Sequence, residues 1–392
     1  MYLTIVIPLA LLAIVLLAPP FKKLYFLLPY LYFSIGPILT YFGVIGVLTG
    51  FNDGELSESY TFGITFYTVY IAYNISKRSE LIKKNPLNFI FSIINPIYLF
   101  TGPIPTNSPF NIRRFKLKRV LKIFNIVNYD LIIGFFFAII LAPTLVPYFY
   151  LKSSTNIIDI FLFGLLFEIY VYFNFAGYSM IAWVLIRLIG LKAPRNFKQP
   201  LGANSIIDYW QRWHISLSII LKELLFVKAK PIFGLYGAIF IVFINSALWH
   251  GISFNFILWG FFHATLWYLS YYLHKFNFKI FNYIIFVFGV VIGRIIFSEN
   301  DSMILLSKLY KIINFTKWND DSVFVILELS LRESINLLLI AFLVAWEFSA
   351  ARMGFLDRDY NHLKSPIIST LILVYTCLSF IGFNGEPIYG NR

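Results

Sequence analysis

Charged residues and cysteine are scarce in this chain of 392 residues. Asp, Glu, Lys and Arg together make up 13% of it, whereas 59% of the residues are hydrophobic and 20% are aromatic. Because soluble domains are only ~45–50% apolar, the composition excludes an ordinary soluble domain. The lone Cys377 also excludes an internal disulfide and a metal site built from cysteines.

Sequence signatures of several enzyme classes are missing as well. The chain has no HExxH or His/Asp metal cluster, no GxSxG nucleophile elbow, no P-loop and no glycine-rich dinucleotide fingerprint. We therefore expect no metal site and no bound cofactor. The net charge of +13 does not indicate nucleic-acid binding, because Lys and Arg collect in the cytoplasmic loops of membrane proteins.

Long apolar runs are what the sequence has instead, and they repeatedly exceed the roughly 18 residues that indicate a membrane helix. The first run, residues 4–20, has no basic residue before it and no small-residue cleavage site, so we expect a retained helix rather than a signal peptide. The charged loops place both termini outside. We predict an all-α polytopic membrane protein, with about ten transmembrane helices in a single integral membrane domain over residues 1–392. Its later crossings are expected at residues 127–150, 157–186, 231–250, 254–273, 280–297, 335–349 and 367–383.

Three further segments do not fit a simple crossing. Residues 89–101 have basic stretches on both sides and are followed by a Gly-Pro-Ile-Pro break, which indicates a re-entrant turn. Residues 205–230 are amphipathic and end in lysines, so we expect them at the cytoplasmic face or dipping in from it. Residues 302–333 are expected to form an outer amphipathic segment. Non-helical backbone at membrane depth is tolerated only where it is buried in protein or lines water, so the re-entrant segment predicts a central cavity.

Two histidines in apolar surroundings are the main candidates for chemistry. His214 ends the segment Tyr-Trp-Gln-Arg-Trp-His, and His250 lies in Leu-Trp-His-Gly. Lipid does not solvate an imidazole, so a histidine there needs a partner or a wet cavity. An imidazole can take a proton from a hydroxyl and return it to a leaving group, as acyl transfer requires. Charge topology places His214 near the cytoplasmic side and His250 deeper or farther out.

A structural role is the alternative for each of these residues. His250 and His214 can be packed histidines without chemistry, and a structural role is the better interpretation of His263. Asn245 lies about one turn before His250, so we expect it to orient the ring or to hold an oxyanion.

Substrate contacts are expected around the histidines. Arg212 is placed to bind a phosphate of a donor such as coenzyme A, or it is an ordinary basic residue of a membrane interface. Glu168 and Asn174 lie within a predicted crossing, where polar side chains are unfavourable, so we expect them to face the cavity. Four tryptophans are either interface-belt residues or walls of an acyl tunnel, namely Trp210, Trp213, Trp249 and Trp259.

The order of these motifs resembles the core of the membrane-bound O-acyltransferase (MBOAT) family, in its bacterial branch, over roughly residues 100–274. By this resemblance His250 takes the place of the family's catalytic histidine, and His214 takes its second signature position. The chain departs from the family's pattern at Asn174, where an Asp is usual, and at residues 221–226, which replace an Arg-Asp-Tyr pattern. The motifs are Gly-Pro-Ile at 102–104, Asn-Phe-Ala-Gly-Tyr-Ser at 174–179, Pro-Arg-Asn-Phe-Lys-Gln-Pro at 194–200, Trp-Gln-Arg-Trp-His-Ile-Ser-Leu-Ser at 210–218, Leu-Trp-His-Gly at 248–251 and Trp-Gly-Phe-Phe-His at 259–263.

The resemblance implies a multi-pass enzyme of the bacterial cytoplasmic membrane. Alginate and peptidoglycan O-acetyltransferases of this branch move acetyl groups across the membrane with an extracytoplasmic partner protein, whereas teichoic acid D-alanyl transferases are fed by a carrier protein. The sequence around His250 looks closer to that of the acetyltransferases. We therefore expect a cytoplasmic donor, either acetyl-CoA or the thioester of an acyl carrier protein, and a surface polysaccharide or a partner protein as acceptor. A glycan-export or transport component is the alternative from another class, and the absence of obvious inverted repeats argues against it.

Overall fold

The computed structural model describes residues 117–189, 193–250, 253–314, 330–352 and 365–381, together with residues 103 and 363. Every regular element in these ranges is a helix, which confirms the all-α prediction for the part described. Four helical segments there are long and apolar enough to cross a membrane, namely Val120–Ser153, Ile157–Leu188, Ile215–Leu248 and Lys279–Ser298. The first predicted crossings and the re-entrant segment at 89–101 lie outside the described residues. The total of about ten crossings and the central cavity therefore stay predictions.

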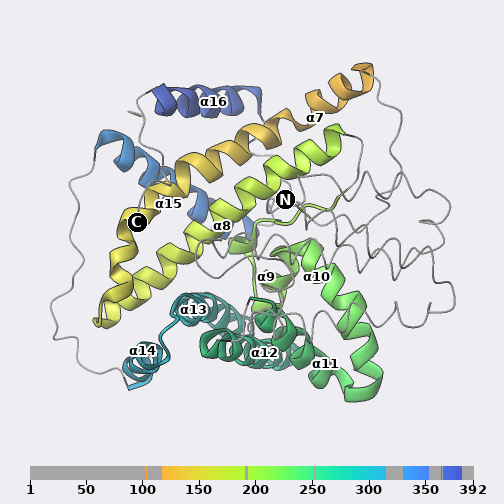
Figure 1. The fold of residues 1–392 in the computed structure, drawn as a ribbon, viewed down its shortest axis with the longest axis vertical. Helices are drawn as coiled ribbons and strands as arrows, with labels where there is room; N and C mark the ends of the chain where they lie inside the picture. Colours follow the sequence, from red (N-terminus) through yellow and green to blue (C-terminus); the bar gives the residue numbers. More distant parts are fainter. Residues whose placement is uncertain are drawn as a thin grey trace, which may run out of the picture.

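Two long helical segments lie side by side across the molecule (Figure 1). The first consists of α7 (Leu117–Phe135), a π-helical turn (Phe136–Leu141) and a 3-10 helix (Pro143–Ser153), and the second is α8 (Ile157–Leu188). They cover the crossings expected at 127–150 and 157–186. α8 has 32 residues and is therefore ~48 Å long. It is longer than a hydrocarbon layer of ~30 Å, so within a membrane it either tilts or extends beyond that layer.

Glycine permits the close contact between these two segments. A Cβ at Gly177 of α8 would lie 2.6 Å from the backbone nitrogen of Ala138 and 2.7 Å from the carbonyl oxygen of Gly134. No other residue type fits against backbone at that distance. The two segments thus form a close pair, and the helix Lys279–Ser298 packs against α8.

The histidine-bearing stretch forms a helical hairpin. α9 (Ile206–Arg212) is followed by α10 (Ile215–Leu221), a π-helical turn (Lys222–Phe226) and α11 (Val227–His250). α11 is broken at Gly234, where φ is 69° and ψ is −174°, a conformation that favours glycine.

Contacts across this break show that the chain folds back on itself. Phe226, before the break, packs against a cluster that contains Ile239 and Phe243, after the break, together with Ala264, and the π-helical turn Lys222–Phe226 contacts α11. The segment expected to dip in and the crossing expected from residue 231 are therefore two arms of one hairpin. Its exposed turn lies at Gly234, three residues beyond the expected boundary.

Helix α12 packs against this hairpin, whereas α15 and α16 pack against the segment that contains α7. α12 contacts both α11 and α13, and α9 lies against both α12 and α13 (Figure 1). A Cβ at Gly260 of α12 would lie 2.9 Å from the Cβ of Ala247 on α11, so this contact is also close. The helices confirm the positions expected from residue 254 onward, and their bounds are Phe254–Lys275 for α12, Lys279–Ser298 for α13, Ser302–Asn314 for α14, Leu331–Arg352 for α15 and Pro366–Ile381 for α16.

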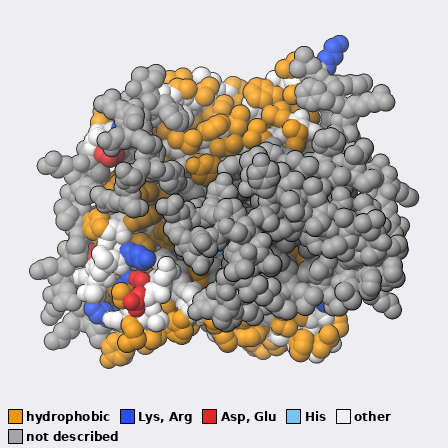
Figure 2. Space-filling view, in the orientation of Figure 1, with side chains coloured by type: hydrophobic (Ala, Val, Ile, Leu, Met, Phe, Trp, Pro, Cys, Tyr) orange, Lys and Arg blue, Asp and Glu red, His pale blue; other side chains and the backbone are white. Residues whose placement is uncertain are grey.

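Hydrophobic side chains cover much of the described surface. In Figure 2 they form broad patches along the upper and lower borders, while charged side chains are confined to small groups. Ile280 on α13, Met303 on α14 and Ile367 on α16 are each about three-quarters exposed. Apolar surface of this extent suits contact with lipid rather than with water. The structure therefore supports a membrane protein.

Candidate active site

His214 lies between α9 and α10 in a left-handed backbone conformation, with φ 44° and ψ 53°. Few residues other than glycine adopt this conformation, and such strained positions cluster at functional sites. The side chain is buried, and its ring packs edge-to-face on Phe175 of α8 with the centroids 4.9 Å apart. The turn and the packing on Phe175 thus hold this imidazole in place.

Residues 194–200 hold this turn in place. The carbonyl oxygen of Asn196 accepts a hydrogen bond from the backbone nitrogen of Ile215 at 2.9 Å. The side-chain oxygen Oδ1 of Asn196 accepts from the backbone nitrogen and the hydroxyl of Ser216, at 3.2 and 2.6 Å. These bonds satisfy donors at the start of α10 that the helix itself leaves free. The Pro-Arg-Asn-Phe motif therefore builds the turn that carries His214.

His250 ends α11 among aromatic rings from two other helices. Its ring centroid lies 4.9 Å from Phe297 of α13. On α12, it lies 5.7 Å from Phe256 and 5.9 Å from Trp259. The side chain is partly buried. The imidazole therefore lies in apolar surroundings with little water around it.

The two histidines lie close enough for their charges to interact, although 36 positions separate them in the sequence. The reason is the hairpin, which turns at Gly234 and brings both of its open ends to the same place. The sequence analysis did not predict this proximity, and the expected positions relative to the membrane, with His214 near the cytoplasmic side and His250 deeper or farther out, stay predictions. The charge pattern of the loops does not reveal a turn within an apolar helical stretch. The structure makes the pair members of one cluster.

His263 of α12 belongs to the same cluster. Its ring centroid lies 4.9 Å from Trp259, which also contacts His250, and 5.0 Å from Trp210. A Cβ at Gly293 of α13 would lie 2.4 Å from its Nε2 atom, so the ring packs directly against the backbone there. Such tight packing fits the structural role that we expected for His263.

Arg294 is the feature that our sequence analysis missed. It lies in α13 next to Gly293, is 8% exposed, and forms an ion pair through Nε with Oε2 of Glu168 on α8. The hydroxyl of Tyr209 on α9 donates to the other carboxylate oxygen of Glu168 at 2.8 Å. The guanidinium carbon lies 4.8 Å from the ring centroid of Trp213, a cation–π distance. Arg294 also interacts electrostatically with His250 and His263.

The sequence contained a signal for this residue. Arg294 interrupts an otherwise apolar crossing, Phe-Val-Phe-Gly-Val-Val-Ile-Gly-Arg-Ile-Ile-Phe, and a charged residue within a membrane helix is a candidate functional residue. Its partner Glu168 is 126 positions away, and nothing in the sequence pairs the two. Glu168 was expected to face the cavity and contact substrate, but in the structure its carboxylate holds Arg294 and Tyr209.

Arg212 makes its hydrogen bonds within the fold. Its Nε donates to Oδ1 of Asp208 at 2.7 Å, and its Nη1 donates to the carbonyl oxygen of Lys198 at 3.3 Å. The backbone nitrogen of Lys198 donates in turn to the carbonyl oxygen of Arg212 at 3.0 Å. The side chain is therefore buried against residues 194–200, and its predicted contact with a donor phosphate stays a prediction.

Of the four tryptophans expected around the histidines, the three with described side chains lie in the interior. Trp213 and Trp259 are 6% and 4% exposed, which does not fit an interface belt facing lipid headgroups. Trp210 is partly buried between Trp259 and Phe243. The side chain of Trp249 lies outside the described residues. The interpretation as walls around the histidines is the better of the two.

The two asparagines expected at the site have different surroundings. Asn245 donates from Nδ2 to the carbonyl oxygen of Ile241 in its own helix, at 2.8 Å, and has no hydrogen bond to His250 among the described residues. Asn174 is partly buried on α8, next to the Phe175 that contacts His214. For Asn245, orienting the ring or holding an oxyanion stays a prediction. For Asn174, contact with substrate stays a prediction.

The arrangement combines proton-accepting groups with one fixed positive charge. Imidazoles accept and return protons, and a buried guanidinium stabilises negative charge strongly because little water competes. The aromatic walls around them exclude water. Such a site suits a reaction in which a hydroxyl loses its proton and a carbonyl oxygen becomes negative.

Comparisons with known proteins point to the same chemistry. The chain is 38% identical over 110 residues to a probable alginate O-acetylase AlgI of Pseudomonas putida, which covers 27% of this chain and 23% of that protein. It is 34% identical over 117 residues to a peptidoglycan O-acetyltransferase of Helicobacter pylori, covering 29% of this chain and 22% of the relative. It is 28% identical over 167 residues to a teichoic acid D-alanyltransferase of Bacillus subtilis, covering 38% of this chain and 42% of the relative.

These relatives confirm the resemblance to membrane-bound O-acyltransferases that the motifs indicated. No protein-family model matches the chain. The similar segments span less than half the length of each of these relatives.

Proposed function

We propose that this chain is a membrane-bound O-acyltransferase with His250 as its base. The observation that supports this most directly is the cluster at the open ends of the helical hairpin, where His214 and His250 lie close together beside the buried cation Arg294. Polar groups of this kind are unfavourable in an apolar protein unless they serve a function. The names of the similar proteins supply the reaction class.

The proposed reaction moves an acyl group from sulfur to oxygen. His250 removes the proton from the acceptor hydroxyl as its oxygen attacks the carbonyl carbon of a thioester. The carbon–sulfur bond then breaks, and the imidazolium returns the proton to the leaving thiolate. His214, which its turn and the packing on Phe175 hold in place, borders the path by which the donor enters. The buried rings of Trp213 and Trp259 exclude water, so that the thioester is not hydrolysed.

The donor is proposed to be a cytosolic thioester, either acetyl-CoA or an acyl carrier protein, and the transferred group to be acetyl. The acceptor is a hydroxyl of a cell-surface polysaccharide, reached directly or through an extracytoplasmic partner protein. The chain would then act as a multi-pass protein of the bacterial cytoplasmic membrane, surrounded by lipid. Support for acetyl transfer to a glycan comes from the relatives named for alginate and peptidoglycan.

D-alanyl transfer to teichoic acid from a carrier-protein thioester is the second candidate. The relatives named teichoic acid D-alanyltransferase, from Bacillus subtilis and Streptococcus thermophilus, favour it. The proton transfers at His250 are the same in both reactions, so the site does not distinguish them.

Chemical identification of the transferred group tests both candidates. Cell envelopes from a strain lacking the chain and from the same strain complemented with it are treated with mild alkali, and the released acids are identified by mass spectrometry. Acetate that depends on the chain supports acetyl transfer, whereas dependent D-alanine supports the second candidate. If complementation changes neither acid, both are contradicted, and the export or transport alternative takes their place.

A further inference from the structure

We propose that Arg294 is a second catalytic residue of this site, which donates hydrogen bonds to the oxyanion formed when the acyl carbonyl is attacked. This inference rests on the proposed acyl transfer. It assigns a chemical role to a residue that none of the recognised motifs includes.

Arg294 lies close to His250, between the rings of Trp213 and Phe297. On one side, its guanidinium carbon is 4.8 Å from the ring centroid of Trp213, the residue directly before His214. On the other side, it is 5.8 Å from the ring centroid of Phe297, and that ring packs on His250 with centroids 4.9 Å apart. The guanidinium therefore borders the space next to His250, with which it also interacts electrostatically, and a reacting carbonyl has to lie in that space.

The surroundings of Arg294 fix it in position without using all of its donors. A guanidinium has five N–H donors. The Nε atom of Arg294 donates to Glu168, and Arg294 also has a side-chain hydrogen bond with Tyr209. In the part of the chain that the structure describes, these are its only hydrogen-bond partners. The terminal amino groups therefore have donors left for a substrate atom, held in advance in the geometry that oxyanion stabilisation requires.

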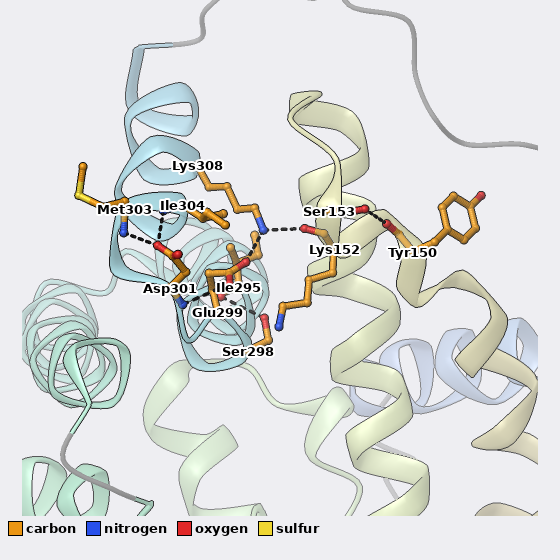
Figure 3. Close-up of polar contacts among 10 residues, drawn as sticks. All are labelled: Tyr150, Lys152, Ser153, Ile295, Ser298, Glu299, Asp301, Met303, Ile304 and Lys308. Carbon is orange, nitrogen blue, oxygen red and sulfur yellow. Dashed lines mark hydrogen bonds and ion pairs between the residues drawn. The ribbon is translucent and has the colours of Figure 1, made fainter. Parts of the chain in front are cut away.

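A comparison with another buried ion pair shows what is particular about Arg294. Lys308 of α14 donates to Oε2 of Glu299 and to the carbonyl oxygen of Lys152, both at 2.6 Å, as Figure 3 shows. These contacts fasten α14 to the ends of two neighbouring segments and explain the buried charge by themselves. Arg294 instead contacts the rings that surround the histidines. A purely structural ion pair does not require that position.

The acceptor oxygen forms a bond to the carbonyl carbon while its proton passes to His250, and the carbonyl π electrons move onto oxygen, which Arg294 stabilises by N–H···O⁻ hydrogen bonds. The intermediate collapses when the electron pair returns to reform the carbonyl and the carbon–sulfur bond breaks. The thiolate takes the proton from the imidazolium. No oxidant, reductant or metal takes part.

Hydroxylamine as acceptor separates the two roles, because it attacks thioesters without a base to remove its proton first. The full chain, purified in lipid nanodiscs, is supplied with acetyl-CoA and hydroxylamine, and the acetyl hydroxamate formed above the protein-free rate is measured. We expect His250→Ala to recover most of the wild-type rate. Arg294→Met is expected to stay about 100- to 1,000-fold below wild type, the loss typical of removing an oxyanion donor. Arg294→Lys, which keeps the charge and one set of donors, should lie between these values.

Lys308→Met is the matched control, since it also removes a buried ion pair but no contact with the rings around the histidines. It should keep nearly the wild-type rate. The role of Arg294 is overturned if hydroxylamine rescues Arg294→Met as well as it rescues His250→Ala, or if Lys308→Met loses as much activity. A different result overturns the proposed function itself, namely no hydroxamate from the wild-type chain with acetyl-CoA or with a thioester-loaded carrier protein.

Discussion

Replacing Glu168 alone should destabilise the protein far more than replacing Glu168, Arg294 and Tyr209 together with apolar residues. Glu168 and Arg294 have side chains that are 2% and 9% exposed, so neither gains solvation when its partner is lost. Glu168→Leu leaves the guanidinium buried without its counter-charge, and breaking a buried pair in this way costs about 3–5 kcal/mol. At about 1.4 kcal/mol per tenfold change, the unfolded fraction should rise by roughly two to four orders of magnitude.

Apolar replacement of the whole group should restore this stability. In the triple variant Glu168→Leu, Arg294→Met and Tyr209→Phe no buried polar atom of the group is left unpaired, and such replacements are often neutral or stabilising. Unfolding in detergent micelles, followed by tryptophan fluorescence against denaturant, measures both variants. Acyl transfer should be lost in both variants, because the triple variant lacks Arg294 and Glu168→Leu lacks the carboxylate that holds Arg294 in position. A triple variant as unstable as Glu168→Leu, or a single variant as stable as wild type, would refute the reasoning.

Three further predictions concern the packing of the site. Asn196→Ala should destabilise the chain by about 1–3 kcal/mol in the same unfolding assay, because two donors of Ser216 lose their acceptor; unchanged stability would contradict that capping role. Gly293→Ala places a Cβ 2.4 Å from Nε2 of His263, so acyl transfer should fall although the substitution adds only a methyl group, and full activity would show that α13 can move away. His214→Asn should be more stable than His214→Ala, because asparagine tolerates the left-handed conformation; equal unfolding midpoints would argue against backbone strain there.

The positions of the helices could be predicted from the sequence because each depends on a local run of apolar residues. The helix expected at 157–186 is Ile157–Leu188 in the structure, and the helix expected at 280–297 is Lys279–Ser298. The hairpin was not predicted, because residues 205–230 were expected at the cytoplasmic face and a separate crossing was expected to begin at Pro231. The helix accommodates that proline and breaks at Gly234, whose left-handed backbone is the real constraint.

The candidate site was only partly predictable. His214, His250 and the tryptophans were recognisable as polar or aromatic residues in apolar surroundings, and the structure brings those with described side chains together. The pairing of Glu168 with Arg294 depends on the packing of α8 against α13. A single sequence contains no information on such a contact. The approach of His214 to His250 was missed for a similar reason, because it depends on one backbone turn between them.

The central claim is that His250 is the base for transfer of an acyl group to an envelope hydroxyl. The direct test is the alkali-released acyl content of envelopes from cells complemented with His250→Ala. His274→Ala is the control, since it alters a histidine in the last turn of α12, away from the cluster. Both variants are compared at equal amounts of membrane-inserted protein. We predict that His250→Ala gives the acyl content of the strain lacking the chain, while His274→Ala gives that of the wild type. A wild-type content in the His250→Ala strain would contradict the account.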